Sequence, residues 1–216
     1  MTLYRVVRAV VVAVCRLLFR VTVEGQEHLP ATGAYVLAPV HRSFVDFGIV
    51  VGVTHRRLRY MGKDSLWSWR PFGAFLTALG AFPVHRGAVD REAFRRSIEV
   101  LAEGDPLVLF PEGTRRRGPV VEDLFEGAAY VAARAGIPVV PVGIGGSERA
   151  QPKGTRLPRP AKVHVVVGEP LPPPPPKPSG QVSRRAVHEL TLRLQQELQQ
   201  LFDQAQTQAG VVSSSP

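Results

Sequence analysis

A histidine and an aspartate lie five residues apart, at His41 and Asp46, where one apolar segment ends and another begins. The apolar run over residues 34–40 predicts a buried strand, and the apolar pattern over residues 47–53 predicts a helix. A strand end would fix the imidazole, while a carboxylate in the first helical turn could accept a hydrogen bond from one ring nitrogen. The other ring nitrogen would then be free to take a proton from a substrate hydroxyl. The pair therefore predicts a general base with an orienting carboxylate.

Two arginines follow predicted strands and support this assignment. Arg86 comes after an expected strand over residues 81–84, and Arg115 comes after one over residues 107–110. Because loops that follow parallel strands open at the same edge of a sheet, we expect both arginines near His41. Their guanidinium forks suit a phosphate group, although either arginine alone would equally suit a solvated surface position.

Glu112 stands between Pro111 and Gly113, a rigid backbone position and a permissive one. This setting would hold the carboxylate in a defined place, where it could orient a substrate hydroxyl or brace an arginine. Gly113 would let a substrate approach the backbone closely, and backbone N–H groups near it could stabilise an oxyanion.

Composition limits the class of protein. With 216 residues and 44% hydrophobic content, the chain can bury one sizeable core, which predicts one domain with terminal appendages. The single cysteine, Cys15, excludes an internal disulfide and a cysteine zinc site; its apolar surroundings predict a buried thiol, and the composition suits a reducing compartment. The net charge of +9 indicates an anionic partner, such as nucleic acid, a lipid surface or a phosphorylated substrate, or else an arginine-rich proteome.

The first twenty residues predict an amphipathic helix. Arginines gather on one side (Arg5, Arg8, Arg16 and Arg20), and apolar side chains fill the other (Leu3, Val6, Val7, Val10, Val14, Leu17 and Leu18). No stretch of 18 uncharged apolar residues occurs, so a spanning helix is not expected. Residues 1–20 instead suit a helix lying in a membrane interface, with packing on the domain's own core as the alternative. A signal peptide fits less well, because residues 15–20 offer no small-residue cleavage site.

Strands and helices alternate along the next part of the chain. Strands are expected at residues 20–24, 34–40, 58–61, 81–84, 107–110, 139–144 and 162–167, and helices at 47–53, 64–79, 90–103 and 124–135. This alternation predicts an α/β fold: a single-domain αβα sandwich with a mostly parallel central sheet, over residues 21–169.

The last part of the chain differs in composition. A proline-rich, extended connector should occupy residues 170–182, followed by a helix over 183–206 and a disordered tail over 207–216. Leucines repeat at helical spacing in that helix, which predicts that one side of it packs on the domain or on another subunit.

Four ordered segments carry a resemblance to a known family. They are His41-Arg42-Ser43-Phe44-Val45-Asp46, Gly80-Ala81-Phe82-Pro83-Val84-His85-Arg86, Phe110-Pro111-Glu112-Gly113-Thr114-Arg115 and Ile137-Pro138-Val139-Val140-Pro141-Val142. Together they resemble the four blocks of the lysophospholipid (glycerolipid) acyltransferase family. The resemblance spans residues 41–142, and the third segment is its most specific part.

The resemblance implies transfer of a fatty acyl group from acyl-CoA or acyl-carrier protein to a glycerophosphate hydroxyl, without a cofactor or a metal. It implies that His41 is the general base and Asp46 its partner. The implied substrate-binding residues are Arg86, Glu112, Gly113, Thr114, Arg115 and Lys63, while Pro138, Val139, Val140, Pro141 and Val142 would shape the acyl-donor side. The chain departs from the family pattern at Val40, where asparagine is common, and at His85, where an acidic residue is common.

The implied chemistry agrees with the residues. Because a thioester is already activated, a hydroxyl deprotonated by His41 can attack it directly. The sequence has no Gly-x-Ser-x-Gly elbow, although Ser43 is an alternative nucleophile. The acyl chain would lie in an apolar tunnel under Trp67, Phe72, Phe75 and Leu79, residues that equally suit a core or a membrane contact.

The leading hypothesis is a 1-acylglycerol-3-phosphate acyltransferase that makes phosphatidate, bound peripherally at the cytoplasmic face of the cell membrane. Its partners would be the membrane surface, a lysophosphatidate-type acceptor and the acyl donor, with no nucleic acid; the oligomeric state stays open. Acylation of glycerol-3-phosphate or of another lysophospholipid is the rival within the same chemistry. Two rivals come from other classes: a lipid-binding protein without catalysis, and a basic nucleic-acid-binding domain, for which base-reading motifs are lacking.

Overall fold

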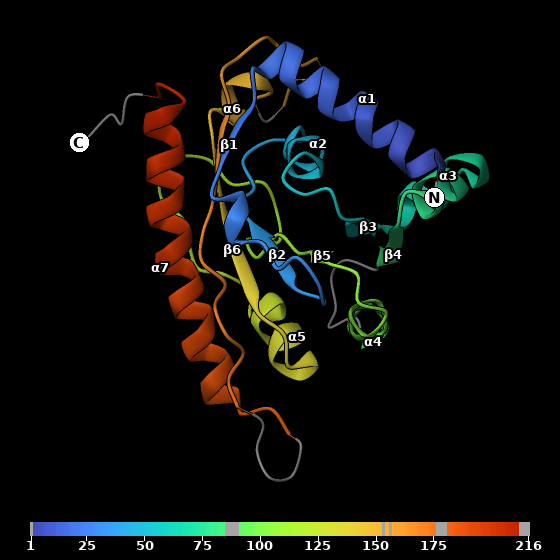
Figure 1. Cartoon of the computed structure of the whole chain (residues 1–216), viewed down its shortest axis with the longest axis vertical. Coiled ribbons are helices and arrows are strands. Elements are labelled where there is room, and N and C mark those ends of the chain that lie inside the picture. The colour runs from blue at the N-terminus through green and yellow to red at the C-terminus, as the bar shows by residue number, and fades with distance from the viewer. Residues whose placement is uncertain (1, 85–90, 153, 156, 176–180, 212–216) are drawn as a thin grey trace.

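Seven strands form one sheet in the computed structural model of the chain, in the order β1-β7-β6-β2-β5-β3-β4 (Figure 1). The strands are β1 (Thr22–Glu24), β2 (Val36–Pro39), β3 (Arg59–Lys63), β4 (Ala81–Val84), β5 (Leu107–Val108), β6 (Val139–Gly145) and β7 (His164–Val167). The structure describes residues 2–84, 91–152, 154–155, 157–175 and 181–211. Neighbouring strands pair in parallel except β6 and β7, which are antiparallel. The predicted α/β fold with a mostly parallel sheet is confirmed.

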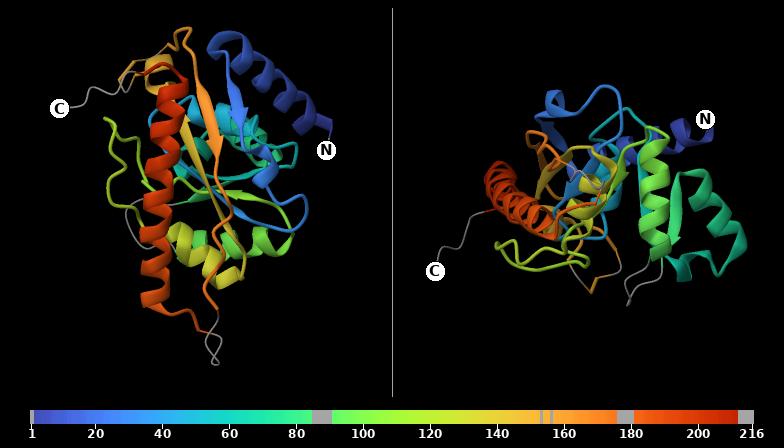
Figure 2. Two further views of the ribbon diagram at one scale, coloured as in Figure 1. Left: turned by 60° about the vertical axis from the view of Figure 1, so that its left-hand side comes forward. Right: turned by 90° about the horizontal axis from the view of Figure 1, so that it is seen from below.

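Helices cover both sides of this sheet. They are α1 (Thr2–Phe19), α2 (Asp46–Val51), α3 (Arg70–Ala78), α4 (Arg91–Ala102), α5 (Gly127–Ala135), α6 (Ser147–Ala150) and α7 (Arg184–Gln208), with 3₁₀ turns η1 (Gln26–His28) and η2 (Asp64–Trp67). In Figures 1 and 2, α7 lies along one side of the sheet, while α1 and α2 lie on the other side.

The two central strands, β2 and β6, are buried along their whole length. Because helices lie on both sides of the sheet, both faces of these strands are covered, which explains why the sequence shows continuous apolar runs there rather than alternation. Val40, which follows β2, donates its backbone N–H to Val142 in β6 at 3.0 Å. The neighbouring strand therefore supports the backbone just before His41.

The strands β2, β5, β3 and β4 are parallel neighbours, so their carboxyl ends share one edge of the sheet. His41 follows β2 and Glu112 follows β5 at this edge, and Lys63 is the last residue of β3. Arg86, which follows β4, lies outside the described residues.

Helix α7 packs on the domain itself, which answers whether its apolar side meets the domain or another subunit. A Cβ atom added at Gly143 or Gly145 of β6 would lie 2.3 or 2.2 Å from the α7 backbone, so these glycines let the helix approach the strand closely. The helix reaches Gln208, and residues 207 and 208, predicted to be disordered, are helical. The predicted boundary is wrong because Gln206 and Ala209 are buried, and the Gln206 side chain accepts the Gly146 N–H at 2.8 Å.

Helix α1 packs on α2 with one side and exposes an apolar stripe on another. Tyr4, Cys15 and Phe19 are buried, and burial raises the pKa of the Cys15 thiol. The exposed stripe consists of Leu3, Val6, Val10, Val14 and Leu17, of which Leu17 is 81% exposed. The alternative of packing on the domain is therefore confirmed for one side of the helix, whereas binding of the exposed side to a membrane stays a prediction.

Arg8 is a correction to the predicted arginine face of α1. Its guanidinium donates to the Thr54 carbonyl at 3.1 and 2.6 Å, on the packed side of the helix. Arg5, Arg16 and Arg20 are exposed. Among the described residues, no helix is both long enough and apolar enough to span a bilayer.

Candidate active site

The imidazole of His41 is held by Asp46, the first residue of α2. The distance from His41 Nδ1 to Asp46 Oδ2 is 3.0 Å, and both side chains are buried. The same carboxylate oxygen accepts the backbone N–H groups of Arg42 and Ser43 at 2.8 and 2.7 Å. Because a buried carboxylate accepts hydrogen bonds, it places the proton of a neutral imidazole on Nδ1 and leaves the Nε2 lone pair free. In the described part of the chain, no side chain or backbone group bonds Nε2.

The main chain of His41 is held by the segment that follows β5. The His41 N–H donates to Glu112 Oε2 at 2.6 Å, and the His41 carbonyl accepts the Arg116 N–H at 2.9 Å. Glu112 is 0% exposed, and its other oxygen, Oε1, accepts a hydrogen bond from the Arg42 guanidinium. Of the two roles that the sequence left open for Glu112, the structure therefore shows the carboxylate bracing an arginine.

The turn at Gly113 does not offer its backbone N–H groups to a substrate. Gly113 has a φ of +65°, its N–H donates to Phe110 at 3.0 Å, and the Thr114 N–H donates to the Glu112 carbonyl at 2.7 Å. Because the turn itself uses these two N–H groups, neither of them is available to stabilise an oxyanion in this conformation. Gly113 and Thr114 are exposed, and Arg115 is half-buried beside them.

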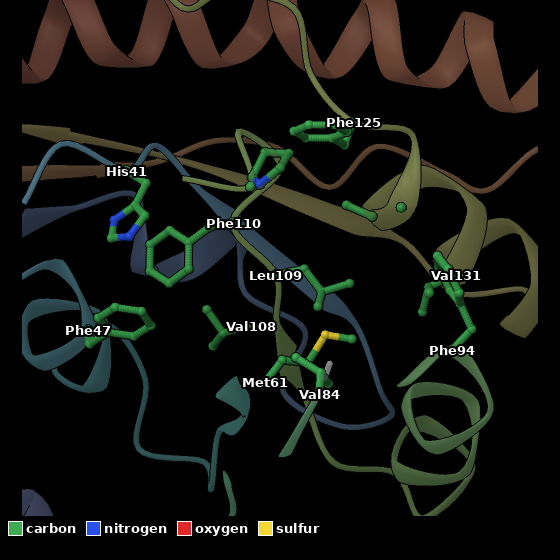
Figure 3. A pocket seen from close by; sticks show the side chains of 14 residues that line it. His41, Phe47, Met61, Val84, Phe94, Val108, Leu109, Phe110, Phe125 and Val131 are labelled. Carbon is green, nitrogen blue, oxygen red and sulfur yellow. The ribbon is translucent and has the colours of Figure 1, made fainter. Parts of the chain in front are cut away.

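An apolar cavity of about 230 Å³ opens beside His41 (Figure 3). His41 lies at one end with Phe47 and Phe110, whose rings are centred 5.3 and 4.3 Å from the imidazole. Phe94 and Val131 lie at the other end, and Met61 lies between them. An imidazole with a free ring nitrogen thus lies at one end of an apolar cavity, an arrangement that suits chemistry on the polar end of a chain-like apolar substrate.

Comparison with known proteins agrees with this arrangement. Residues 20–145, more than half of the chain, match the family model described as Acyltransferase. The chain belongs to the acyltransferase family. It is an O-acyltransferase, and the resemblance seen in the four sequence segments is confirmed.

Several relatives have names that specify a reaction. The chain is 33% identical over 152 residues to a 1-acyl-sn-glycerol-3-phosphate acyltransferase of Bacillus subtilis, a match covering 70% of this chain and 73% of that protein. A 1-acyl-sn-glycerol-3-phosphate acyltransferase of Chlamydomonas reinhardtii is 32% identical over 163 residues, covering 72% of this chain and 48% of the algal protein. The crystal structure of the 1-acyl-sn-glycerophosphate acyltransferase PlsC from Thermotoga maritima superposes with a TM-score of 0.71 at 26% identity, covering 85% of this chain and 71% of that one.

Some residues predicted for the acyltransferase site lie away from the cavity. Residues 138–142 belong to β6 or directly precede it; they pair with β2, the strand before His41, and do not line the cavity. Their contribution to the acyl-donor side stays a prediction. None of the residues of the expected tunnel, Trp67, Phe72, Phe75 and Leu79, lines this cavity. They lie in η2 and α3 or just after it, and Trp67 packs against Gly62 of β3. The cavity instead lies against β5, α4 and α5.

Two residues in contact with this candidate site were missed by sequence reasoning. Arg42 is 2% exposed and binds Glu112, and its guanidinium carbon lies 4.6 Å from the ring centre of Phe202 in α7. Arg42 stands next to His41 in the first segment, so its position could have drawn attention to it. No pattern in the sequence connects Phe202 to the site.

Proposed function

We propose that the chain transfers a fatty acyl group from acyl-CoA or acyl-carrier protein to the free hydroxyl of 1-acylglycerol-3-phosphate, giving phosphatidate. The acceptor follows from the names of the relatives. The observation that carries the chemistry is the His41 imidazole, bonded to Asp46 through Nδ1 and placed at one end of the apolar cavity.

In the proposed reaction, His41 Nε2 takes the proton of the acceptor hydroxyl while the hydroxyl oxygen attacks the thioester carbonyl carbon. The tetrahedral intermediate then expels the thiol sulfur, which receives the proton from the imidazolium, and the base is restored. Asp46 stabilises the imidazolium and keeps the ring in one orientation. Ser43 is a poor candidate for a nucleophile, since its buried hydroxyl donates to the Gln151 carbonyl at 2.8 Å.

The apolar cavity supports a site for the fatty acyl chain of the donor, with the thioester at the His41 end. The acceptor phosphate would bind outside the cavity at the carboxyl edge of the sheet, where Arg115 is half-buried. Arg86 and Lys63 follow or end neighbouring strands and would add positive charge at that edge.

We place the enzyme peripherally at the cytoplasmic face of the membrane, held by α1. The exposed stripe from Leu3 to Leu17 would enter the apolar part of the interface, and the exposed Arg5, Arg16 and Arg20 would meet lipid headgroups. The single buried cysteine agrees with a reducing compartment.

The test is thiol release by the purified chain with a matrix of acyl donors and acceptors. Lysophosphatidate should be the best acceptor, ahead of glycerol-3-phosphate and of lysophospholipids with larger headgroups. His41→Ala should abolish thiol release while circular dichroism and melting temperature show a folded protein. The mechanism is excluded if folded His41→Ala turns over normally, and the acceptor assignment is excluded if another acceptor gives a higher kcat/KM.

A further inference from the structure

We infer that helix α7 positions the catalytic histidine through a buried relay of side chains, Phe202 to Arg42 to Glu112. The inference rests on the proposed role of His41 as the base. It assigns Arg42, Glu112 and Phe202 as positioning residues, which act on His41 and do not touch the substrate.

The first contact of the relay joins α7 to Arg42. Phe202 is 0% exposed, and the guanidinium of Arg42 lies over its ring, 4.6 Å from the centre. A guanidinium stacked on an aromatic face is attracted by the ring and loses freedom to tilt. Phe202 therefore fixes the plane in which Arg42 presents its N–H groups.

The second contact joins Arg42 to the main chain of His41. Glu112 Oε1 accepts from Arg42, while Glu112 Oε2 accepts the His41 N–H at 2.6 Å. One carboxylate thus links the guanidinium to the backbone of the base. A shift of Arg42 would move Glu112, and Glu112 would carry the His41 amide with it.

A second set of contacts ties α7 to the loop that follows the Gly113 turn. Gln199 accepts the Val121 N–H at 2.7 Å and donates to the Pro119 carbonyl at 3.0 Å, and Gln195 donates to the Val121 carbonyl at 3.1 Å. Arg42 donates to the Val120 carbonyl of the same loop at 3.1 Å. The helix therefore holds both Arg42 and a loop whose first part, at Arg116, bonds the His41 carbonyl.

This arrangement goes beyond what stability alone requires. A buried ion pair contributes little net stability compared with well-packed apolar side chains. Here the pair uses its remaining oxygen to fix the residue that must stand within hydrogen-bond distance of a substrate hydroxyl. Rates of such proton transfers respond strongly to small displacements.

The experiment compares Phe202→Leu, which removes the ring face, with Phe202→Tyr, which keeps it. Phe202→Leu should lower kcat about 10- to 100-fold while KM for acceptor and donor stays within about threefold, and Phe202→Tyr should keep most of kcat. The matched control is Leu190→Ala, a buried truncation in the first part of α7, which should cost stability and leave kcat of the folded enzyme unchanged. ¹⁵N NMR of histidine-labelled protein should show the backbone N–H signal of His41, which donates to Glu112, shifted in Phe202→Leu and unshifted in Leu190→Ala.

Glu112 gives a second, independent test. The pair variant Arg42→Met/Glu112→Gln removes both buried charges together and so avoids leaving one unpaired. A fall in kcat with unchanged KM for lysophosphatidate supports positioning, whereas a rise in KM with unchanged kcat would show that Glu112 binds the acceptor and would overturn the relay. A wild-type kcat together with an unshifted His41 backbone N–H signal in Phe202→Leu would also overturn the relay, as would an equal loss of kcat in Leu190→Ala. Because the NMR signal needs no turnover, failure of the relay is distinguishable from failure of the proposed reaction.

Discussion

Asp46 gathers three hydrogen bonds on one carboxylate oxygen, from the His41 ring and from the backbone N–H groups of Arg42 and Ser43. Its other oxygen, Oδ1, is buried and has no hydrogen-bond partner in the described chain. The two backbone hydrogen bonds fix the orientation of the Asp46 carboxylate, and the fixed carboxylate in turn orients the His41 ring. Asp46 therefore sets the ring of His41, while Glu112 sets its main chain.

Asp46→Asn should lower kcat by about 10³- to 10⁴-fold without unfolding the protein. An amide can turn its NH₂ group toward Nδ1, which would leave the proton on Nε2 and remove the base. Thiol release under saturating donor and acceptor measures the effect. Asp123→Asn is the control, since Asp123 is exposed in the loop before α5. A loss smaller than about tenfold for Asp46→Asn would contradict the tautomer argument.

At the scale of elements, α4 and α5 close the far end of the cavity. Phe94 of α4 and Val131 of α5 line that end, and the Phe94 ring meets Tyr130 of α5 edge-on, with centres 5.4 Å apart. The contact between the two helices thus limits how deep an apolar chain could reach (Figure 3).

Val131→Phe should shift the preferred acyl donor toward shorter chains, and Phe94→Ala should shift it toward longer ones. For the longest donor that the wild type accepts, Val131→Phe should lower kcat/KM about tenfold or more, because the added ring fills space needed by terminal methylenes. The profile of kcat/KM against chain length measures both shifts. Val100→Ala, buried in α4 but not lining the cavity, should keep the wild-type profile. An unchanged profile in both cavity variants would mean that the acyl chain binds elsewhere.

At the scale of the whole molecule, α1 and α7 lie on opposite sides of the sheet and have different surfaces (Figure 1). The outer side of α1 is an apolar stripe, whereas α7 buries most of its leucines on β6 and β7. Near the start of α1, Arg57 lies over the Tyr4 ring and donates to Ala78 at the end of α3. Exposed Trp69, Phe72 and Phe75 in and before α3 extend the apolar character of this region.

Val10→Glu/Leu17→Glu should weaken binding to phosphatidylglycerol-containing vesicles by about 10- to 100-fold for each side chain replaced. The reason is that both side chains would leave water when α1 enters the interface, and a carboxylate would not. Vesicle flotation measures the binding. Leu192→Glu, an exposed leucine on α7, is the control and should float like the wild type. Equal loss in the control, or full binding by the α1 variant, would contradict attachment through α1.

Much of the fold could be predicted because buried parallel strands are apolar throughout, and the helices between them keep an apolar period. His41, Asp46 and Glu112 could be predicted because strand ends of a parallel sheet meet at one edge. The cavity could not be predicted, because apolar periodicity shows which side of a helix or strand is buried but does not show which other element packs against that side. For the same reason the aromatic residues of α3 were expected over a tunnel, and the Arg42–Phe202 contact was not expected.

The close contact of α7 with Gly143 and Gly145 also bears on how the protein is made. During translation the His41 loop leaves the ribosome early and Phe202 leaves it late, because α7 follows every strand in the sequence. The surface on which α7 packs is complete only after β6 and β7 have paired. Strand β1, near the start of the chain, can join the sheet only after β7 has been synthesised, because β7 is the strand with which it pairs. If α7 positions His41 as inferred, a nascent chain that has not yet formed α7 lacks the contacts that orient this histidine. Full activity would then be reached only after α7 has been synthesised and has packed on the sheet.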